Sequence, residues 1–234
     1  MGALAAALLL SGCNMNNTTK GGLIGGAGGG ALGAGLGAAI GALAGGSSGA
    51  KLGAAIGAGV GVAGGATAGV LIGKKMDKAK AAAQAVDNAQ VETVTDKNGL
   101  EAVKVSFDNG ILFKVGKSDL QAKAQASLRQ FANNVLNVYT DCDVAIYGFA
   151  SSEGGEELNL TLSQDRANAV RGFLTNTCGV STSQIKSTTG YGEDPQYLVY
   201  DANGKEDVNA SRRVEVYLYA SEAMINAANA GTLK

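Results

Sequence analysis

The second half of the sequence predicts an α+β fold, a mixed β-sheet with helices on one face, in the order βαβαββ. Two kinds of pattern support this prediction. One is a set of short apolar or alternating segments bounded by turn residues, which is typical of strands. The other is a pair of longer segments with helical periodicity, which lie between the strands. The strands are expected at residues 103–107, 143–149, 184–190 and 214–219.

Each helix is predicted from its periodicity and its first residue. Ser118 precedes an amphipathic segment and is expected to cap it, because a Ser side chain can accept a hydrogen bond from the first turn. The apolar positions of this segment are Leu120, Ala124, Leu128, Phe131, Val135 and Tyr139. A second helix is expected from about residue 159 to residue 176. A charged, Ala-rich helix is expected earlier, at residues 74–90, before the turn at Asp96–Gly99.

Composition divides the chain of 234 residues into two unlike halves. Between Gly21 and Gly73 the only charged residue is Lys51, whereas all 20 acidic residues lie beyond Gly73. This slightly acidic second half is not expected to bind nucleic acid. The sequence contains no His, which excludes a Ser-His-Asp triad and makes a catalytic metal site unexpected. We therefore expect no cofactor, no metal and no enzyme activity.

The amino terminus contains a short apolar stretch that ends at a cysteine. Leu10-Ser11-Gly12-Cys13 follows this stretch and resembles the lipobox, at which lipoprotein signal peptides are cut and the new terminal cysteine is acylated. Cys13 is therefore the expected lipidation site. Residues 14–19 carry no acidic cluster that would indicate export to the cell surface, so a lipid anchor in the outer membrane facing the periplasm is expected.

Glycine recurs at every fourth position from Gly21 to Gly73, and this pattern resembles a glycine zipper. An interior glycine costs a helix about 1 kcal/mol relative to Ala, so a free helix in water is not expected. In a bilayer, small residues at this spacing let two helices pack closely, and a turn at residues 45–51 would give a helical hairpin. The alternative interpretation is a flexible Gly/Ala spacer.

Cys142 and Cys178 are expected at the same end of one strand–helix unit. Cys142 starts the second predicted strand, and Cys178 follows the helix that runs back antiparallel to it. In an oxidising periplasm this arrangement predicts a disulfide, which would stabilise the fold by roughly 4 kcal/mol in the chain-entropy model.

Five motifs follow one another in the second half of the sequence. They are Phe113-Lys114-Val115-Gly116, Gly148-Phe149-Ala150-Ser151-Ser152-Glu153-Gly154, Asn159-Leu160-Thr161-Leu162-Ser163-Gln164-Asp165-Arg166-Ala167, Gly190-Tyr191-Gly192 and Ser211-Arg212-Arg213-Val214-Glu215-Val216. In order and spacing they resemble the OmpA-like peptidoglycan-binding domain, and the resemblance covers about residues 100–220.

This resemblance implies non-covalent binding of the diaminopimelate side chain of the peptidoglycan stem peptide. In the family, an aspartate receives the ligand's ammonium group, and an arginine fifteen residues later pairs with a carboxylate. Arg166 occupies the arginine position, but Ser151 stands at the aspartate position. Either Glu153 supplies the missing carboxylate, or binding is weak or lost, because a neutral hydroxyl bonds an ammonium less strongly than a carboxylate does.

The same residues also have structural interpretations. Arg166 is either a ligand-binding group or a solvated surface side chain. Asn159 is either a ligand contact or a helix cap, and Ser163 is either a ligand contact or a local polar contact. Of Arg212 and Arg213, one is expected to brace the sheet or bind the ligand. The candidate peptidoglycan-binding residues are thus Ser151, Glu153, Asn159, Arg166 and Arg212.

Two functional hypotheses follow from this organisation. The first is an envelope anchor, and the second is a glycine-zipper protein that forms a homo-oligomer or a pore and has weakened peptidoglycan binding. The predicted segments are a signal peptide and lipobox (1–13), a tether (14–20), the glycine-zipper hairpin (21–73), a helical linker (74–99), the OmpA-like domain (100–220) and a tail (221–234).

Overall fold

The computed structural model describes residues 65–95 and 101–233. Cys13 and most of the glycine series lie outside these residues. The helices are α3 (Gly65–Gln84), α4 (Asn109–Leu112), α5 (Ala122–Phe131), a π-helical extension η1 (Ala132–Leu136), α6 (Glu156–Asn176), a short 3-10 helix η2 (Pro195–Tyr197), α7 (Val208–Ser211) and α8 (Glu222–Asn229). The strands are β1 (Ala89–Thr95), β2 (Glu101–Asp108), β3 (Cys142–Phe149), β4 (Ile185–Gly190) and β5 (Arg213–Ala220).

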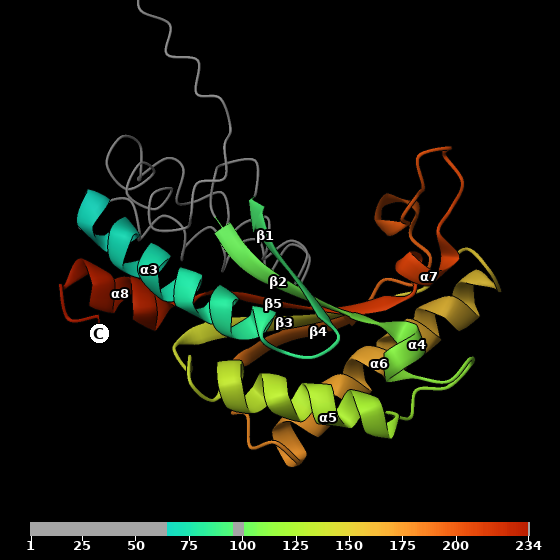
Figure 1. Cartoon of the computed structure of the whole chain (residues 1–234), viewed down its shortest axis with the longest axis horizontal. Helices are drawn as coiled ribbons and strands as arrows, with labels where there is room; N and C mark the ends of the chain where they lie inside the picture. Colours follow the sequence, from blue (N-terminus) through green and yellow to red (C-terminus); the bar gives the residue numbers. More distant parts are fainter. Residues whose placement is uncertain (1–64, 96–100, 234) are drawn as a thin grey trace, which may run out of the picture.

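The strands form one five-stranded mixed sheet in the order β1-β2-β5-β3-β4 (Figure 1). Only the β3–β4 pair is parallel, and α6 forms the crossover between these two strands. The pairs β1–β2, β2–β5 and β3–β5 are antiparallel. The predicted α+β fold with a mixed sheet is therefore confirmed, and the predicted βαβαββ order runs from β2 to β5.

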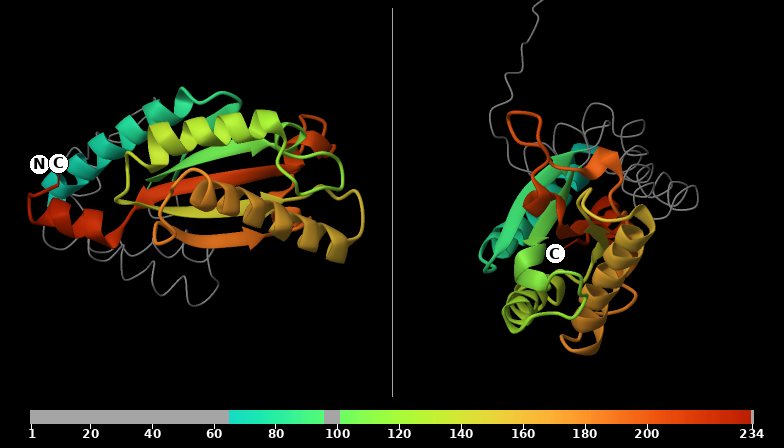
Figure 2. Two further views of the ribbon diagram at one scale, coloured as in Figure 1. Left: turned by 90° about the horizontal axis from the view of Figure 1, so that it is seen from below. Right: turned by 90° about the vertical axis from the view of Figure 1, so that its right-hand side faces the viewer.

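One face of the sheet carries the hydrophobic core. The alternation predicted for β2 holds, because Val103, Val105 and Phe107 are all buried. They share the core with Val214 and Val216 of β5 and with apolar residues of α3, α5 and α6. Figure 2 shows α5 and α6 on the same side of the sheet. This side-chain alternation is what places the helices over one face, as predicted.

The segment before β2 differs from the helix predicted at residues 74–90. Helix α3 begins at Gly65 and ends at Gln84, and a strand, β1, begins at Ala89. Asn88 adopts a left-handed conformation at φ 60°, which turns the chain between them. Strand β1 then pairs with β2 over its whole length. The linker predicted at residues 74–99 therefore contributes an edge strand to the sheet.

Two further boundaries differ from the prediction. Ser118 does not cap α5, because this helix begins at Ala122, directly after Gln121. The segment predicted as a tail contains α8, where the side chain of Ser221 accepts a hydrogen bond from the backbone N–H of Met224 at 3.1 Å. Met224 is buried in the main core, so α8 is part of the folded unit.

The membrane interpretation of the glycine series concerns residues outside the described part. Only its last members, Gly65, Gly69 and Gly73, are described, and they lie in α3. Within residues 65–95 and 101–233, no helix is both long and apolar enough to cross a membrane.

Candidate functional site

The candidate site lies where the carboxyl end of β3 meets the first half of α6. Two glycines let the helix approach the sheet closely. A Cβ atom added to Gly148 would lie 2.1 Å from the carbonyl oxygen of Ser163, and one added to Gly190 would lie 2.2 Å from the backbone nitrogen of Gln164. Any larger residue at either position would push α6 away. The glycines therefore set the depth at which α6 presents its side chains.

Ser151 follows β3 and is almost fully buried, with 2% of its surface exposed. Its hydroxyl accepts a hydrogen bond from Nε of Arg212 at 3.2 Å. Ser151 therefore faces the interior of the site rather than solvent, in contact with a cation.

Glu153 pairs with the same arginine. Its carboxylate lies 2.5 Å from an NH2 nitrogen of Arg212, and the Glu153 side chain is 66% exposed. Arg212 thus contacts Ser151 with one nitrogen and Glu153 with another. Since the Glu153 carboxylate already has a cationic partner, it is not the unpaired acid that an ammonium ligand would need.

Asn159 holds the loop between β3 and α6 in place. Its side-chain amide donates to the carbonyl oxygens of Ser151 at 3.2 Å and Glu153 at 3.1 Å, and to the carboxylate of Glu193 at 2.5 Å. These bonds favour the local structural interpretation of Asn159. It is not the helix cap, because Gly155 occupies that position.

Ser163 is likewise engaged in the fold. Its hydroxyl donates to the carbonyl oxygen of Leu160 at 2.9 Å and accepts from the backbone N–H of Gly192 at 2.8 Å. The first contact is local, within α6, and the second ties α6 to the loop after β4.

Arg166 is buried, with 3% of its surface exposed, so it is not a solvated surface side chain. Its Nε atom donates to the carbonyl oxygen of Lys117 at 3.1 Å. Its guanidinium carbon lies 5.4 Å from the ring centroid of Phe113, a cation–π contact. No acidic residue of the described ranges forms an ion pair with it. The guanidinium is therefore held in place without a balancing carboxylate.

The electrostatics of Arg166 reflect this burial. Desolvation by burial, together with the positive charge of Arg212, lowers the pKa of the Arg166 guanidinium from 12.5 to about 10. Arg166 nevertheless stays protonated at neutral pH. Because Arg166 has no acidic partner among the described residues, its guanidinium could pair with a carboxylate ligand, which guanidinium binds bidentately.

Arg213 points away from this site and braces the other face of the sheet. Its Nε donates to Glu215 at 2.7 Å, and its NH1 donates to the carbonyl oxygens of Tyr197 and Ser211 at 3.1 Å each. Its guanidinium lies 4.3 Å from the ring centroid of Phe149. The open choice between the two arginines is thus resolved: Arg213 braces the sheet, and Arg212 faces Ser151.

Two carboxylates near the site were not predicted from the sequence. Glu193 is bonded to Asn159, and Glu206 accepts hydrogen bonds from Ser152, including one from its backbone N–H at 3.2 Å. Both lie in irregular segments after β4, where hydrophobic periodicity gives no signal. Their spacing from β3 in the sequence, more than 40 residues, also hides the contact.

The predicted disulfide is not formed in the structure. Cys142 and Cys178 are both free thiols. The Sγ atom of Cys142 lies 3.9 Å from Sδ of Met76, so this side chain is directed toward α3. The sequence predicts the two cysteines at one end of the β3–α6 unit, but the thiol of Cys142 lies against Met76 of α3 instead.

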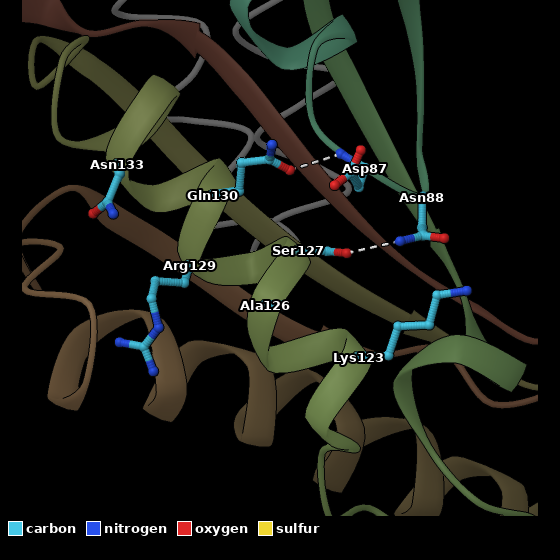
Figure 3. A pocket seen from close by; sticks show the side chains of 8 residues that line it. All are labelled: Asp87, Asn88, Lys123, Ala126, Ser127, Arg129, Gln130 and Asn133. Atoms are coloured by element: carbon cyan, nitrogen blue, oxygen red, sulfur yellow. Dashed lines mark hydrogen bonds between the residues drawn. The ribbon is translucent and has the colours of Figure 1, made fainter.

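A shallow hollow lies away from the site, between α5 and the turn before β1 (Figure 3). Two hydrogen bonds cross its wall: the backbone N–H of Asp87 donates to Gln130 at 2.8 Å, and Asn88 donates to Ser127 at 3.0 Å. None of the five candidate residues lines it. The described ranges also contain no group of three or more His, Cys, Asp or Glu side chains that could hold a metal ion. The hollow is lined by Asp87, Asn88, Lys123, Ala126, Ser127, Arg129, Gln130 and Asn133.

Comparison with known proteins agrees with this geometry. Residues 112–213 match the model of the OmpA family. The peptidoglycan-associated lipoprotein of Brucella melitensis is 35% identical over 99 residues, which cover 42% of this chain and 57% of that protein. Outer membrane porin F of Pseudomonas aeruginosa is 32% identical over 129 residues, which cover 53% of this chain and 35% of the porin. The chain thus matches only part of each relative.

The fold also has a counterpart among solved structures. A MotB-like protein from Desulfovibrio vulgaris has a TM-score of 0.50 at 20% identity, over 64% of this chain and 94% of that one. At this identity the likeness concerns the fold alone. Together with the family match, it supports an OmpA C-terminal-like domain over residues 112–213, the part of the chain that contains Ser151, Arg166 and Arg212.

Proposed function

We propose that this chain anchors the cell envelope by binding peptidoglycan non-covalently, with Arg166 as the receptor for a carboxylate of the stem peptide. The observation that carries the proposal is the state of Arg166: buried, fixed by Lys117 and Phe113, and without an acidic partner among the described residues. A buried guanidinium without a carboxylate is costly, and an anionic ligand would offset that cost. The name of the Brucella relative, peptidoglycan-associated lipoprotein, supports the same ligand.

The ammonium side of the ligand has a weaker receptor in this proposal. Ser151 offers a neutral hydroxyl, and the Glu153 carboxylate is paired with Arg212. Since charge-assisted hydrogen bonds are roughly twice as strong as neutral ones, we expect lower affinity than an aspartate at position 151 would give. Binding that proves too weak to measure would favour the alternative, a glycine-zipper oligomer whose domain has lost its ligand.

Location in the envelope is a further part of the proposal. Lipidation at Cys13 would hold the chain in the outer membrane with the domain facing the periplasm, as the lipobox-like sequence suggests. Mass spectrometry of the amino-terminal peptide tests this directly. An unacylated Cys13 in protein purified from a Gram-negative membrane fraction would contradict the lipid anchor.

A sacculus pull-down tests the site. Full-length protein in detergent is incubated with purified sacculi, and the bound fraction is compared among wild type, Arg166→Ala and Arg171→Ala. We expect Arg166→Ala to lose at least about tenfold in apparent affinity, the scale of one charge-assisted contact. Arg171 lies on the same helix but is exposed, so its removal should have little effect. Undiminished binding by Arg166→Ala would refute the assignment of the site.

A further inference from the structure

An aromatic cluster lies on the sheet face opposite the hydrophobic core, here called the outer face. Side chains alternate along a strand, so Tyr147 and Phe149 of β3 and Tyr217 and Tyr219 of β5 all point to this face. Their rings are in contact, since the centroids of Tyr147 and Tyr217 lie 5.3 Å apart. The aromatic cluster consists of Tyr147, Phe149, Tyr191, Tyr197, Tyr217 and Tyr219.

The long helices lie on the core side of the sheet. Helices α3, α5, α6 and α8 pack into the core through residues such as Met76, Leu128, Val170 and Met224. In the described part of the chain, the aromatic cluster is built only from β3, β5 and the segment after β4. Tyr147 is nevertheless 1% exposed, and its hydroxyl is buried without a hydrogen bond of normal geometry to a described residue. Such a hydroxyl is unfavourable, so a further polar backbone group at the outer face would stabilise it.

The charged side chains of the outer face pair with one another around the aromatic cluster. Glu215 lies 2.7 Å from Arg213 and 3.8 Å from Lys104, and Asp143 lies 3.5 Å from Lys186. The aromatic rings between them carry no charge. A charged partner would lose its hydration here without gaining an ion pair, which is unfavourable. The outer face therefore favours an occupant that is uncharged and largely apolar.

The segment before α3 has this composition. Between Gly21 and residue 64 the only charged residue is Lys51. Glycine at every fourth position lets the backbone approach the flat faces of aromatic rings, and its N–H and C=O groups stay available to tyrosine hydroxyls. Larger side chains such as those of Leu36 and Ile40 would bury apolar surface between the rings.

The segment also joins the domain at the right place. Helix α3 begins beside α8, and α8 directly follows β5 (Figures 1 and 2). The chain thus enters α3 near the end of the sheet at which Tyr219 lies. From there the outer face extends along the eight residues of β3, roughly 26 Å, which about eight extended residues would span. Residues 21–64 are long enough to cross it more than once.

We propose that residues 21–64 dock on the outer face and cover the aromatic cluster. The docked segment places its backbone against the rings and supplies a hydrogen-bond partner to the hydroxyl of Tyr147. A docked segment cannot cross a membrane at the same time, so the domain offers its glycine-rich segment a place outside the bilayer. This docking is independent of the ligand at Arg166.

Photo-cross-linking of the full chain in detergent tests the docking. The variant Tyr219→p-benzoylphenylalanine carries the probe on the outer face, and Tyr200→p-benzoylphenylalanine carries it at an exposed position outside the aromatic cluster. Trypsin cuts after Lys20 and Lys51, so the intervening peptide is readily identified by mass. We expect the probe at position 219 to join residues 21–64 of the same chain, and the control probe to give no such product. A product that joins two copies, or no product with the segment, overturns the proposal.

Nitration of the native tyrosines provides a second measurement that leaves the outer face unaltered. In wild type, tetranitromethane should modify the exposed Tyr200 first and leave Tyr217 and Tyr219 protected. The double variant Leu36→Asp/Ile40→Asp puts two charges into the segment. Because these carboxylates would lose hydration at the outer face, Tyr217 and Tyr219 should become reactive.

Asn16→Asp/Asn17→Asp is the matched control, since it adds the same charge before the glycine series and should preserve the protection. Thermal unfolding of each variant verifies that the fold is intact. Equal protection of Tyr217 and Tyr219 in the two double variants overturns the docking and leaves the proposed function standing.

Discussion

Arg212 donates from Nε to the hydroxyl of Ser151 at 3.2 Å, so a cation directly contacts the position at which the family carries an aspartate. This relationship defines what the site lacks. A carboxylate at position 151 would pair with Arg212 and would place a second negative charge beside Glu153. The present hydroxyl gives Arg212 a neutral acceptor instead.

The variant Ser151→Asp should therefore strengthen peptidoglycan binding. With carboxylates at both 151 and 153, Arg212 can pair with one, which leaves the other to accept the ligand's ammonium group. We expect this to be worth about 1–2 kcal/mol, or roughly five- to thirtyfold in affinity. Sacculus binding at low and moderate salt measures the change. Ser152→Asp is the matched control, because it adds the same charge one residue away, where the side chain faces Glu206. Equal gains in both variants would indicate a non-specific charge effect.

Arg212 and Arg213 are adjacent in sequence but should contribute very differently to stability. Arg213→Ala would leave Glu215, which is 3% exposed, with only Lys104 as a cationic neighbour at 3.8 Å. We expect a loss of about 2–4 kcal/mol, since removing one partner of a buried pair strands the other charge. Arg212→Ala, in a more exposed pair, should cost at most about 1 kcal/mol. Urea unfolding of both variants checks this; equal losses would contradict the assignment of Arg213 as the structural arginine.

The sequence predicts the layers of this fold better than its junctions. Alternation reports burial directly, so the core strand β2 is predicted from the sequence, whereas Arg166 is identified only through the family motif. The start of α5 was misplaced, because Ser118 is a strong capping residue in isolation, yet Leu120 pairs with Phe113 as an isolated β-bridge and delays the helix. Strand β1 was missed, since it follows an Ala-rich helix without the Gly or Pro residues that usually separate elements.

Contacts between distant segments were the hardest to predict. The alternation of Arg213, Glu215 and Tyr217 contained the signal that Arg213 belongs to the opposite face, since Tyr217 also donates to Glu215, at 2.6 Å. The direction of the Cys142 side chain had no such signal. It depends on the position of Met76 in α3, 66 residues earlier in the chain, which sequence spacing does not encode.

Replacing the buried cation should stabilise the domain while abolishing its function. Arg166→Met keeps much of the side-chain volume but removes the charge whose burial lowers the pKa of Arg166. We expect a gain of about 1 kcal/mol in the free energy of unfolding, because a buried charge without an acidic partner is unfavourable. Denaturant unfolding and sacculus binding should move in opposite directions. Lower stability together with lost binding would instead indicate that Arg166 mainly supports the fold.

Stability should fall in alkaline solution through Cys142. Burial, together with the negative charge of Asp141, raises the pKa of this thiol from 9.0 to about 12. Between these values the unfolded chain releases the proton while the folded chain keeps it, so the free energy of unfolding decreases as pH rises above 9. Between pH 8 and 10.5, wild type should lose about 2 kcal/mol more than Cys142→Ala. Identical pH profiles would show that the thiol is not protected.

Cys142 should also resist alkylation until the protein unfolds. The thiolate is the reactive form, and the raised pKa keeps the buried thiol protonated. Cys178 is only partly buried and should react first, which peptide mapping after limited iodoacetamide treatment would detect. A non-reducing digest that yields a peptide joining Cys142 to Cys178 would contradict the free-thiol state.

Gly190 should be among the positions of the domain least tolerant of substitution. The Cβ of Gly190→Ala would lie 2.2 Å from the backbone nitrogen of Gln164 and 2.6 Å from Oγ of Ser163, so α6 would have to move. We expect a loss of about 3 kcal/mol in the free energy of unfolding, together with weaker peptidoglycan binding, because the shift displaces Arg166.

Gly172→Ala is the matched control, because Gly172 lies in α6 itself, where the nearest atom to an added Cβ is 3.9 Å away. That substitution should raise stability by about 0.5–1 kcal/mol, since Ala favours a helix over Gly. If Gly190→Ala behaved like Gly172→Ala, the close approach of α6 would not be what positions the arginine.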